Sequence, residues 1–327
     1  MTDAWAPDIL GHPFAQLTLH LGTDDEGQVV ATLVRRLPTL WARLTGPLRD
    51  VDVLYVHGWS DYFFQSDLAG MWADLGARFF ALDLRKYGRS LREGQTPGYV
   101  HDLTKYDEDI AAALTAMGSR AGRRLVLLGH STGGLVLSLW AHRHPDAAAA
   151  LILNSPWLEF QLGAVGRRAI QPLVSARARF DPRGGQMGTD YGFYSRAQRE
   201  IGSIPTTAGF VQKWRPDRAF STHPGWLHAI MTGHREVEAG LKLTCPVLVL
   251  LSARSVSPLV WSEAMTSADA VLVVDEIARA SLKLGDLVTV ARIDGAIHDV
   301  FLSSPEPRRQ ALRVTRRWAV GVLTASE

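Results

Sequence analysis

The stretch that decides the fold of this chain is L-V-L-L-G-H-S-T-G-G-L, residues 125–135. Its apolar first part predicts a buried strand, and the helical pattern after the serine predicts a sharp strand-to-helix turn. Residues 129–133 read G-H-S-T-G, the pattern of a nucleophile elbow, in which a strained turn carries the serine. Gly129 and Gly133 have no Cβ to obstruct such a turn. We therefore interpret Ser131 as the candidate nucleophile.

Apolar runs and helical patterns alternate on both sides of this turn. Residues 14–23 and 27–37 alternate polar and apolar around D-D-E-G, which is typical of a hairpin. Strands are then expected at 52–56, 79–84, 125–128, 150–153, 246–251 and 288–293, and helices at 63–75, 107–117, 135–142, 276–284 and 305–323. This order predicts an α/β fold with a mostly parallel sheet and helices on both faces. Functional groups in such sheets lie at the carboxyl ends of the strands, where Ser131 falls.

The pattern breaks between residues 156 and 240. This segment is rich in aromatic residues, glycine and arginine and shows no strand periodicity. A structureless loop of that length does not occur in a compact protein, so we expect an inserted lid of short helices. The prediction is a core domain of residues 1–155 and 241–327 with a lid of residues 156–240.

Composition excludes several classes of protein. The chain of 327 residues carries 35 Lys+Arg and 33 Asp+Glu, a net charge of +2 that gives no indication of nucleic-acid binding. Cys245 is the one cysteine, so no disulfide can form within the chain. The sequence contains no run of about 18 apolar residues, so no integral membrane segment is predicted. Residues 1–10 do not resemble a secretory signal. We expect a cytoplasmic protein whose oligomeric state the sequence leaves open.

A serine hydroxyl needs a neighbouring base to become a nucleophile. His298 is the best-placed histidine, because it follows the strand expected at 288–293 in a loop of small residues, G-A-I-H. His130 adjoins the serine but would point away across the turn. Two backbone N–H groups are expected to hold the oxyanion, that of Thr132 at the helix start and that of Trp59 in H-G-W-S-D.

Three motifs together resemble the α/β-hydrolase superfamily: H-G-W-S-D-Y-F-F-Q (57–65), L-D-L-R-K-Y-G-R-S (82–90) and L-G-H-S-T-G-G (128–134). More narrowly, they resemble the branch of monoacylglycerol lipase-like enzymes, lysophospholipases and serine aminopeptidases. The resemblance covers the chain from about residue 25 onwards, except the lid. It implies the α/β-hydrolase fold with an eight-stranded core, a lid after the sixth strand, and hydrolysis through an acyl-enzyme without a metal or another cofactor.

The sequence departs from this branch at the acid of the triad. Relatives usually carry an aspartate in a Gly-x-x-Asp turn after the seventh strand, whereas residues 252–255 here read S-A-R-S. Asp269 is the preferred substitute, because its spacing of 29 residues from His298 fits the family. Asp275 is the alternative acid, although it could instead cap the helix expected from residue 276. Asp294 is too close to His298 in sequence to reach its far nitrogen easily.

The aromatic lid favours an apolar carboxylic ester as the substrate, a small molecule. Candidate substrate-binding residues are His130, Phe63 and Trp157. An aminopeptidase or amidase would need acidic groups for a substrate ammonium, and Glu159 is the one candidate in the lid. An acyltransferase using the same triad, or a ligand-binding homologue without catalysis, also fits the pattern.

Overall fold

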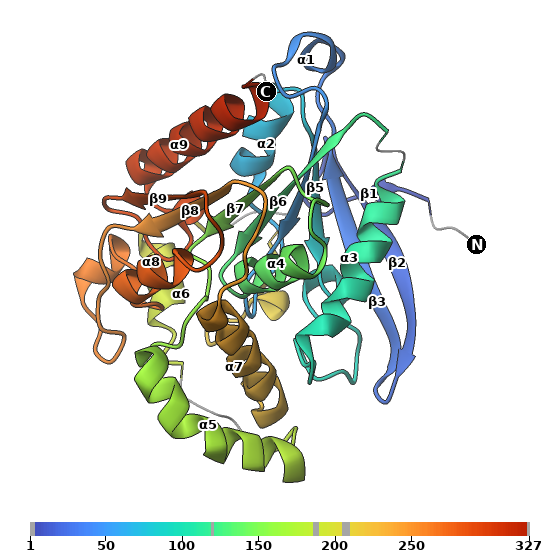
Figure 1. The fold of residues 1–327 in the computed structure, drawn as a ribbon. Coiled ribbons are helices and arrows are strands. Elements are labelled where there is room, and N and C mark those ends of the chain that lie inside the picture. The colour runs from blue at the N-terminus through green and yellow to red at the C-terminus, as the bar shows by residue number, and fades with distance from the viewer. Residues whose placement is uncertain (1–3, 119–120, 186–189, 205–209, 326–327) are drawn as a thin grey trace.

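A computed structural model describes residues 4–118, 121–185, 190–204 and 210–325. One sheet crosses the described chain in the order β1-β2-β3-β5-β4-β6-β7-β8-β9 (Figure 1). Its strands are β1 (Ala6–Pro7), β2 (Phe14–Asp24), β3 (Gly27–Arg36), β4 (Val51–Val56), β5 (Arg78–Asp83), β6 (Arg124–His130), β7 (Ala150–Asn154), β8 (Val247–Ser252) and β9 (Val288–Ile293). Neighbours from β5 to β9 are parallel, and β1, β2 and β3 are antiparallel additions. The predicted mostly parallel sheet is confirmed.

Helices cover both faces of the sheet. They are α1 (Leu40–Thr45), α2 (Ser66–Asp74), α3 (Tyr106–Ala116), α4 (Thr132–Arg143), α5 (Gly163–Phe180), α6 (Phe193–Glu200), α7 (Pro224–Ala239), α8 (Val274–Ser281) and α9 (Pro305–Thr324). Single turns of 3-10 helix lie at η1 (Gly88–Ser90), η2 (Leu103–Lys105), η3 (Gln212–Trp214), η4 (Glu263–Thr266) and η5 (Val300–Leu302). No helix in the described residues is long and apolar enough to span a membrane.

Two hydrophobic cores lie on opposite faces of the sheet. Along β6, Leu125 and Leu127 belong to one core, and Val126 and Leu128 to the other. Side chains of a strand alternate between faces, so a strand covered on both sides must be apolar throughout. The first core is completed by α3, α4, α7 and α8, and the second by α2 and α9. This burial explains the unbroken apolar runs of the central strands.

The expected eight-stranded core differs from the structure by one strand. Residues Ala6–Pro7 pair with β2 and make the sheet nine-stranded. The sequence did not predict this strand, because two residues are too few to show an alternating pattern. Helix α2 begins at Ser66 rather than at residue 63. The backbone N–H of Phe63 donates to Asp83 Oδ1 at 3.0 Å and that of Phe64 to Gln65 Oε1 at 3.0 Å, which holds the preceding loop in a non-helical conformation.

Residues 156–240, called the cap segment from here on, lie between β7 and β8. Their described part contains α5, α6, η3 and α7 and no strand, but α5 and α7, with 18 and 16 residues, are longer than the short helices expected. Helix α5 packs on α7, and Figure 1 shows both at the end of the molecule opposite α1. The cap segment thus follows β7 at the same sheet edge as the turn after β6.

Candidate active site

Ser131 occupies a strained turn between β6 and α4. Its φ of 50° and ψ of −116° lie in a region that residues with a side chain rarely adopt. A Cβ on residue 133 would lie 2.3 Å from the carbonyl oxygen of His57, and one on residue 129 would lie 2.7 Å from that of Gly133. Only glycine fits at either position, so the G-x-S-x-G pattern follows from the close packing of this turn.

His298 lies between the serine and a carboxylate. Its Nε2 is 3.0 Å from the Ser131 hydroxyl oxygen, and its Nδ1 is 2.9 Å from Asp269 Oδ2. All three side chains are buried. The other carboxylate oxygen of Asp269 accepts the backbone N–H groups of Val271 and Leu272 at 2.7 and 2.8 Å. In this arrangement a carboxylate can orient the imidazole, and the imidazole can take the serine proton.

The long connection after β8 explains how Asp269 reaches His298. The chain leaves the sheet after Ser255 and returns at Asp269, where the two residues form a bridge. Asp269 N–H donates to the carbonyl of Arg254 at 3.0 Å, and Val256 N–H donates to the carbonyl of Asp269 at 2.8 Å. The intervening residues form a loop outside the sheet that contains η4. The carboxylate therefore lies just beyond the end of β8 although it is 17 residues later than Ser252 in the chain.

Asp275, the alternative acid, lies elsewhere. Its side chain is exposed, and its carboxylate accepts a hydrogen bond from Arg292 at 2.6 Å. The interpretation of Asp275 as a helix cap is wrong, because Val273 is the N-cap of α8 and Asp275 lies in its first turn. The helix dipole favours a negative charge in the first turn, which accounts for the position of Asp275.

Thr132 and Trp59, the two predicted oxyanion donors, line one cavity together with Ser131. Thr132 is the first residue of α4, and within the described residues neither its N–H nor that of Trp59 donates to the protein. Gly58 lets the loop before Trp59 approach closely, because a Cβ there would lie 3.0 Å from the Ser131 Cβ. Such free N–H groups can stabilise a developing oxyanion.

His57 holds this loop in place, a role that sequence reasoning missed. Its Nδ1 donates to the carbonyl of Gly58 at 2.8 Å, and its Nε2 accepts the N–H of Leu84 at 3.1 Å. Burial lowers the pKa of His57, which keeps the ring neutral with the single N–H that this pairing requires. The H-G dipeptide after a buried strand was the available signal.

Two cavities meet at Ser131. The first, about 340 Å³, contains His298 and polar groups including Ser60, Asp61, Ser195 and Arg215. The second, about 320 Å³, contains Thr132 and is lined by aromatic and aliphatic side chains, namely Trp157, Phe160, Phe220, Trp226, Leu227 and Leu272. Trp59, Gln161, Asp190, Ala219 and Val271 line both cavities. Apolar side chains such as Tyr191, Phe193 and Leu259 also line the first cavity. The serine therefore faces a mixed arm, called the polar arm because of its charged and hydroxyl groups, and an apolar arm.

The structure brings together some of the predicted substrate-binding residues and not others. Trp157 lines the apolar arm and His130 the polar arm. Phe63 lines neither, and the expectation for this residue is wrong. It is fully buried in the core with Phe14, Tyr55 and Phe79, because its position after β4 turns the ring onto the sheet.

Glu159 is not available for a substrate ammonium. Its carboxylate accepts hydrogen bonds from the buried guanidinium of Arg167 at 2.7 and 3.2 Å. Arg167 also pairs with Glu238 at 2.6 Å. The ion pairs hold α5 against α7, so Glu159 has a structural role within the cap segment.

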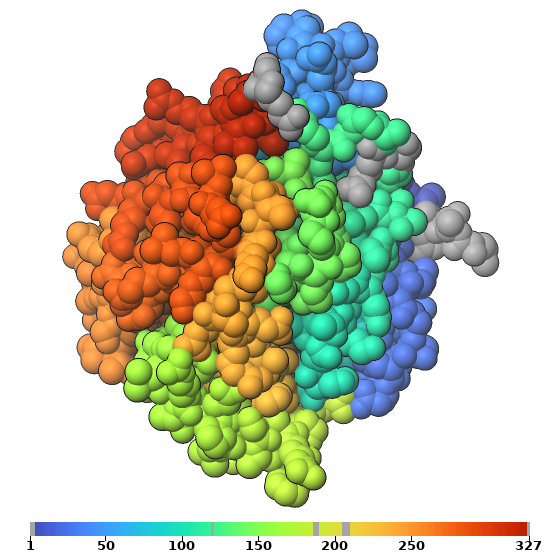
Figure 2. All heavy atoms as spheres, viewed as in Figure 1, coloured from blue at the N-terminus to red at the C-terminus, as the bar shows by residue number. Residues whose placement is uncertain are grey.

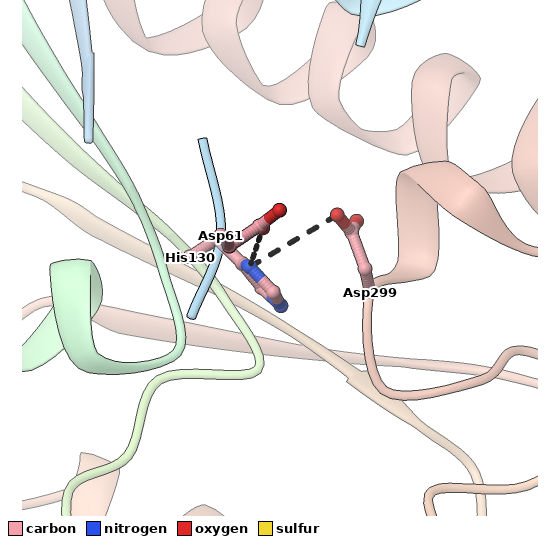
Figure 3. Close-up of side chains that lie close together, drawn as sticks. All are labelled: Asp61, His130 and Asp299. Carbon is pink, nitrogen blue, oxygen red and sulfur yellow. Dashed lines mark ion pairs between the residues drawn. The ribbon is translucent and has the colours of Figure 1, made fainter. Parts of the chain in front are cut away.

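His130 lies between two buried carboxylates (Figure 3). Its Nδ1 is 3.5 Å from Asp61 Oδ2 and 4.0 Å from Asp299 Oδ2. Burial opposes the charged ring, but Asp299 and Asp61 outweigh it and raise the pKa of His130. Burial likewise opposes the ionised carboxyl of Asp61, whereas Arg215 and His130 lower its pKa. A protonated His130 and the Arg215 guanidinium together would balance the charges of the two carboxylates.

These three residues also have the spacing of a metal site. Among the described residues, Asp61, His130 and Asp299 are the one group whose donor atoms all lie within 4.8 Å of one another. Arg215 already donates to Asp61 Oδ1 at 2.8 Å, and Gln65 donates to Asp299 Oδ2 at 3.1 Å. A proton on His130 gives a neutral cluster, whereas a divalent ion would leave excess buried positive charge. The donor set therefore fits a proton better than a metal ion.

Tyr194 and Arg215 of the cap segment contact this cluster, Gln198 connects the two, and sequence reasoning missed all three. Tyr194 accepts the N–H of Asp299 at 3.0 Å, and its ring lies edge-on to His298 at 5.6 Å. Gln198 donates to the Tyr194 hydroxyl at 3.1 Å and accepts from Arg215 at 2.6 Å. No periodicity or motif marks them, because their roles depend on a contact between distant segments.

A profile of the family described as serine aminopeptidase, S33 (Hydrolase_4) matches residues 49–257. The chain belongs to this family. The matched region contains both the elbow and the loop of His57, while His298 lies beyond it. Membership agrees with the α/β-hydrolase fold described above.

Proteins that are similar to this S33-family chain include lipases and esterases. A monoacylglycerol lipase of Mycolicibacterium smegmatis is 30% identical over 131 residues, which cover 38% of this chain and 43% of the relative. The aligned region thus spans less than half of that relative.

Solved structures show the same fold. A monoacylglycerol lipase of Paleococcus ferrophilus has a TM-score of 0.63 at 19% identity, covering 85% of this chain and 96% of its own. A soluble variant of the Saccharomyces cerevisiae monoglyceride lipase has a TM-score of 0.65 at 15% identity, covering 94% and 97%. A carboxyl esterase of Bacillus coagulans has a TM-score of 0.65 at 12% identity, covering 95% and 99%. At these identities the likeness concerns the fold alone.

Proposed function

We propose that this protein is a serine hydrolase that cleaves a carboxylic ester through an acyl-enzyme, with Ser131, His298 and Asp269 as its triad. The observation that carries the proposal is the pair of contacts at 3.0 and 2.9 Å that link Ser131, His298 and Asp269 in line. The family membership and the likeness to ester-cleaving enzymes support the same reaction class.

The two arms of the site indicate which part of the ester each would hold. In acyl transfer the histidine protonates the leaving alcohol, so the alcohol leaves on the side of His298. The oxyanion donors hold the carbonyl of the acyl group on the other side. The polar arm contains His298, and the apolar arm contains Thr132. An apolar acyl group with a small polar alcohol therefore fits the site best.

The reaction follows from these positions. His298 Nε2 takes the Ser131 proton while the serine oxygen attacks the carbonyl carbon, and the N–H groups of Thr132 and Trp59 hold the oxyanion. His298 then gives the proton to the leaving alcohol, and the acyl group stays on Ser131. A water molecule, deprotonated by His298, releases the acid. Asp269 keeps the Nδ1 proton on the ring and stabilises the imidazolium.

The cap segment is proposed to act as the lid of this site. Residues Gln161, Asp190, Tyr194, Arg215 and Phe220 belong to it and line one or both arms. They cover the serine on the side away from the sheet, and exclusion of water strengthens the electrostatic contacts beneath.

The test is a Ser131→Ala variant assayed on p-nitrophenyl esters of increasing chain length. We expect a loss of at least about 10³-fold in turnover, because the serine and its base act as a unit. Labelling of the natural protein by a fluorophosphonate probe, mapped to Ser131, is the companion measurement. Hydrolysis by the variant at the natural rate, or a natural protein that the probe does not label, would refute the proposal.

An aminopeptidase is the second candidate function, because the family description names that activity. Asp190 lines both arms and forms no ion pair among the described residues, so it is the carboxylate best placed to bind a substrate ammonium. Its oxygens accept the N–H groups of Gly192 at 2.8 Å and of Ala219 at 2.6 Å, which indicates a structural task. Comparing aminoacyl p-nitroanilides with p-nitrophenyl esters separates the two functions.

A further inference from the structure

Helix α5 carries an apolar stripe on the face that points into solvent. Leu162, at its N-cap, is 66% exposed, and Val165, Leu173 and Phe180 are 80%, 68% and 84% exposed. Exposed Ala169, Pro172 and Ala176 lie between them. At 3.6 residues per turn these seven positions share one side of the helix. We call this set the α5 stripe.

The stripe is not the face that packs on the protein. Arg167 and Val174 are the buried residues of α5, and they lie on the opposite side of the helix. They contact the rest of the cap segment through Glu159, Glu238 and α7. Helix α5 thus has an apolar face beyond the one that its own fold uses. A contiguous apolar face of this kind marks an interaction surface.

Positive charge flanks the stripe on both sides. Arg168 and Arg179 lie along one edge of it and Arg177 along the other, and no Asp or Glu occurs between residues 163 and 180. Arg177 and Arg179 form no ion pair within the described residues, whereas Arg168 pairs with Glu238. An amphipathic helix with an apolar face and arginines along its edges is the pattern of a helix that lies in the surface of an anionic membrane.

The stripe is also placed beside the site. Gln161, which lines both arms of the cavity, immediately precedes Leu162. Figure 2 shows the α5 segment along one edge of the molecule, at the end opposite α1. A lipid surface seated on α5 would therefore lie next to the segment that covers Ser131.

We propose that α5 docks this protein onto anionic lipid surfaces, with the α5 stripe inserted among the acyl chains and Arg177 and Arg179 among the headgroup phosphates. This docking goes beyond the proposed ester hydrolysis and does not depend on it. Binding of this kind is peripheral, because the apolar face is only one side of a helix.

The test uses the full chain with Ser131→Ala, so that lipids are not consumed. Sedimentation is measured with vesicles of phosphatidylcholine alone and of phosphatidylcholine mixed with phosphatidylglycerol. We expect binding to the mixed vesicles that Leu173→Asp with Phe180→Asp weakens at least about tenfold, since each of these side chains loses its burial in the acyl region. Arg177→Gln with Arg179→Gln should remove most of the preference for the mixed vesicles.

Helix α1 supplies the matched control. Leu40, Trp41 and Leu44 are 72%, 75% and 68% exposed, and they lie at the other end of the molecule. Leu40→Asp with Leu44→Asp should leave vesicle binding unchanged. Absence of binding to mixed vesicles, or an equal loss in the α1 variant, would overturn the proposal.

Two further measurements complete the test. Hydrolysis of a water-soluble ester by the α5 variant with Ser131 intact should equal that of the natural protein, because neither substituted residue lines the cavities. Equal melting temperatures would show that the variant folds. Sedimentation velocity examines whether the stripe instead joins two copies of the chain. A dimer that the α5 substitutions dissociate, without vesicle binding by the natural protein, would assign the stripe to self-association and contradict lipid docking.

Discussion

The backbone N–H of Asp299 donates to the hydroxyl of Tyr194 at 3.0 Å, and this contact joins the cap segment to the residue that follows His298. It continues through Gln198 to Arg215 and from there to Asp61 in the loop of Trp59. Asp61 and Asp299 both face His130 in the elbow. The three loops that carry the site are thus connected through residues of the cap segment.

Removing the Tyr194 hydroxyl should loosen the loop of His298. We expect Tyr194→Phe to lower kcat about tenfold with little change in KM, because small displacements of a positioned base reduce the rate more than they weaken binding. Steady-state kinetics on a soluble ester measure both constants. Tyr55→Phe is the control, since the Tyr55 hydroxyl is buried and has no partner among the described residues. A kcat for Tyr194→Phe equal to that of the control would show that the hydrogen bond does not position His298.

The Arg215–Asp61 ion pair should stabilise the packing of the cap segment on the loop that follows β4. Both side chains are buried, so Arg215→Met leaves the Asp61 carboxylate without its cation. We expect a loss of about 3–5 kcal/mol in the free energy of unfolding, measured by urea denaturation. The double variant Arg215→Met with Asp61→Leu should regain most of this loss, because it leaves no unpaired charge. Equal stability of the single and double variants would contradict the pairing.

Asp269 and Asp275 can be separated by one matched pair of variants. Asp269→Asn should reduce kcat by about 10³- to 10⁴-fold, because the amide would favour the wrong tautomer of His298. Asp275→Asn should retain activity within about twofold, since its carboxylate contacts Arg292 on the surface. The assay is hydrolysis of the same soluble ester. A similar loss in both variants, with both proteins folded, would refute the assignment of the acid.

His234 should make the fold sensitive to acid. It is fully buried, and burial lowers its pKa to about 4. Its Nε2 donates to the carbonyl of Trp157 at 2.9 Å. The unfolded chain binds this proton near pH 6.5 and the folded protein only near pH 4, so stability falls as the pH decreases between these values, by on the order of 3 kcal/mol. His234→Gln, which keeps a donor for Trp157, should show a shallower loss of unfolding free energy over that range.

The elements of the core and the position of the strained turn that carries the candidate nucleophile could be predicted from local patterns. A strand buried on both faces must be apolar throughout, and a helix that packs on one side must repeat its apolar residues every three to four positions. Residues 125–135 combine both patterns around two glycines that the turn requires, which is why the elbow could be placed to the residue. Helix α1 and strand β1 were not predicted, because six and two residues carry too little periodicity.

The rest of the site depends on contacts between segments far apart in the chain. Phe63 and Phe64 stand side by side in a motif beside the site, yet Phe63 packs in the core beneath β4 and Phe64 contacts Phe210 of the cap segment. The role of Tyr194 has no local signature either, since it acts through Asp299, which is 105 residues later.

The sequence by itself determined the parallel sheet, the strained turn at Ser131 and the order in which the candidate nucleophile, acids and base follow one another, because these depend on residue spacing and backbone sterics. Only the tertiary structure decided that Asp269 rather than Asp275 meets His298, and that Arg215 neutralises Asp61. The physical reason is that the pairing of buried charges depends on distances of a few ångströms between loops, and chain order does not encode those distances.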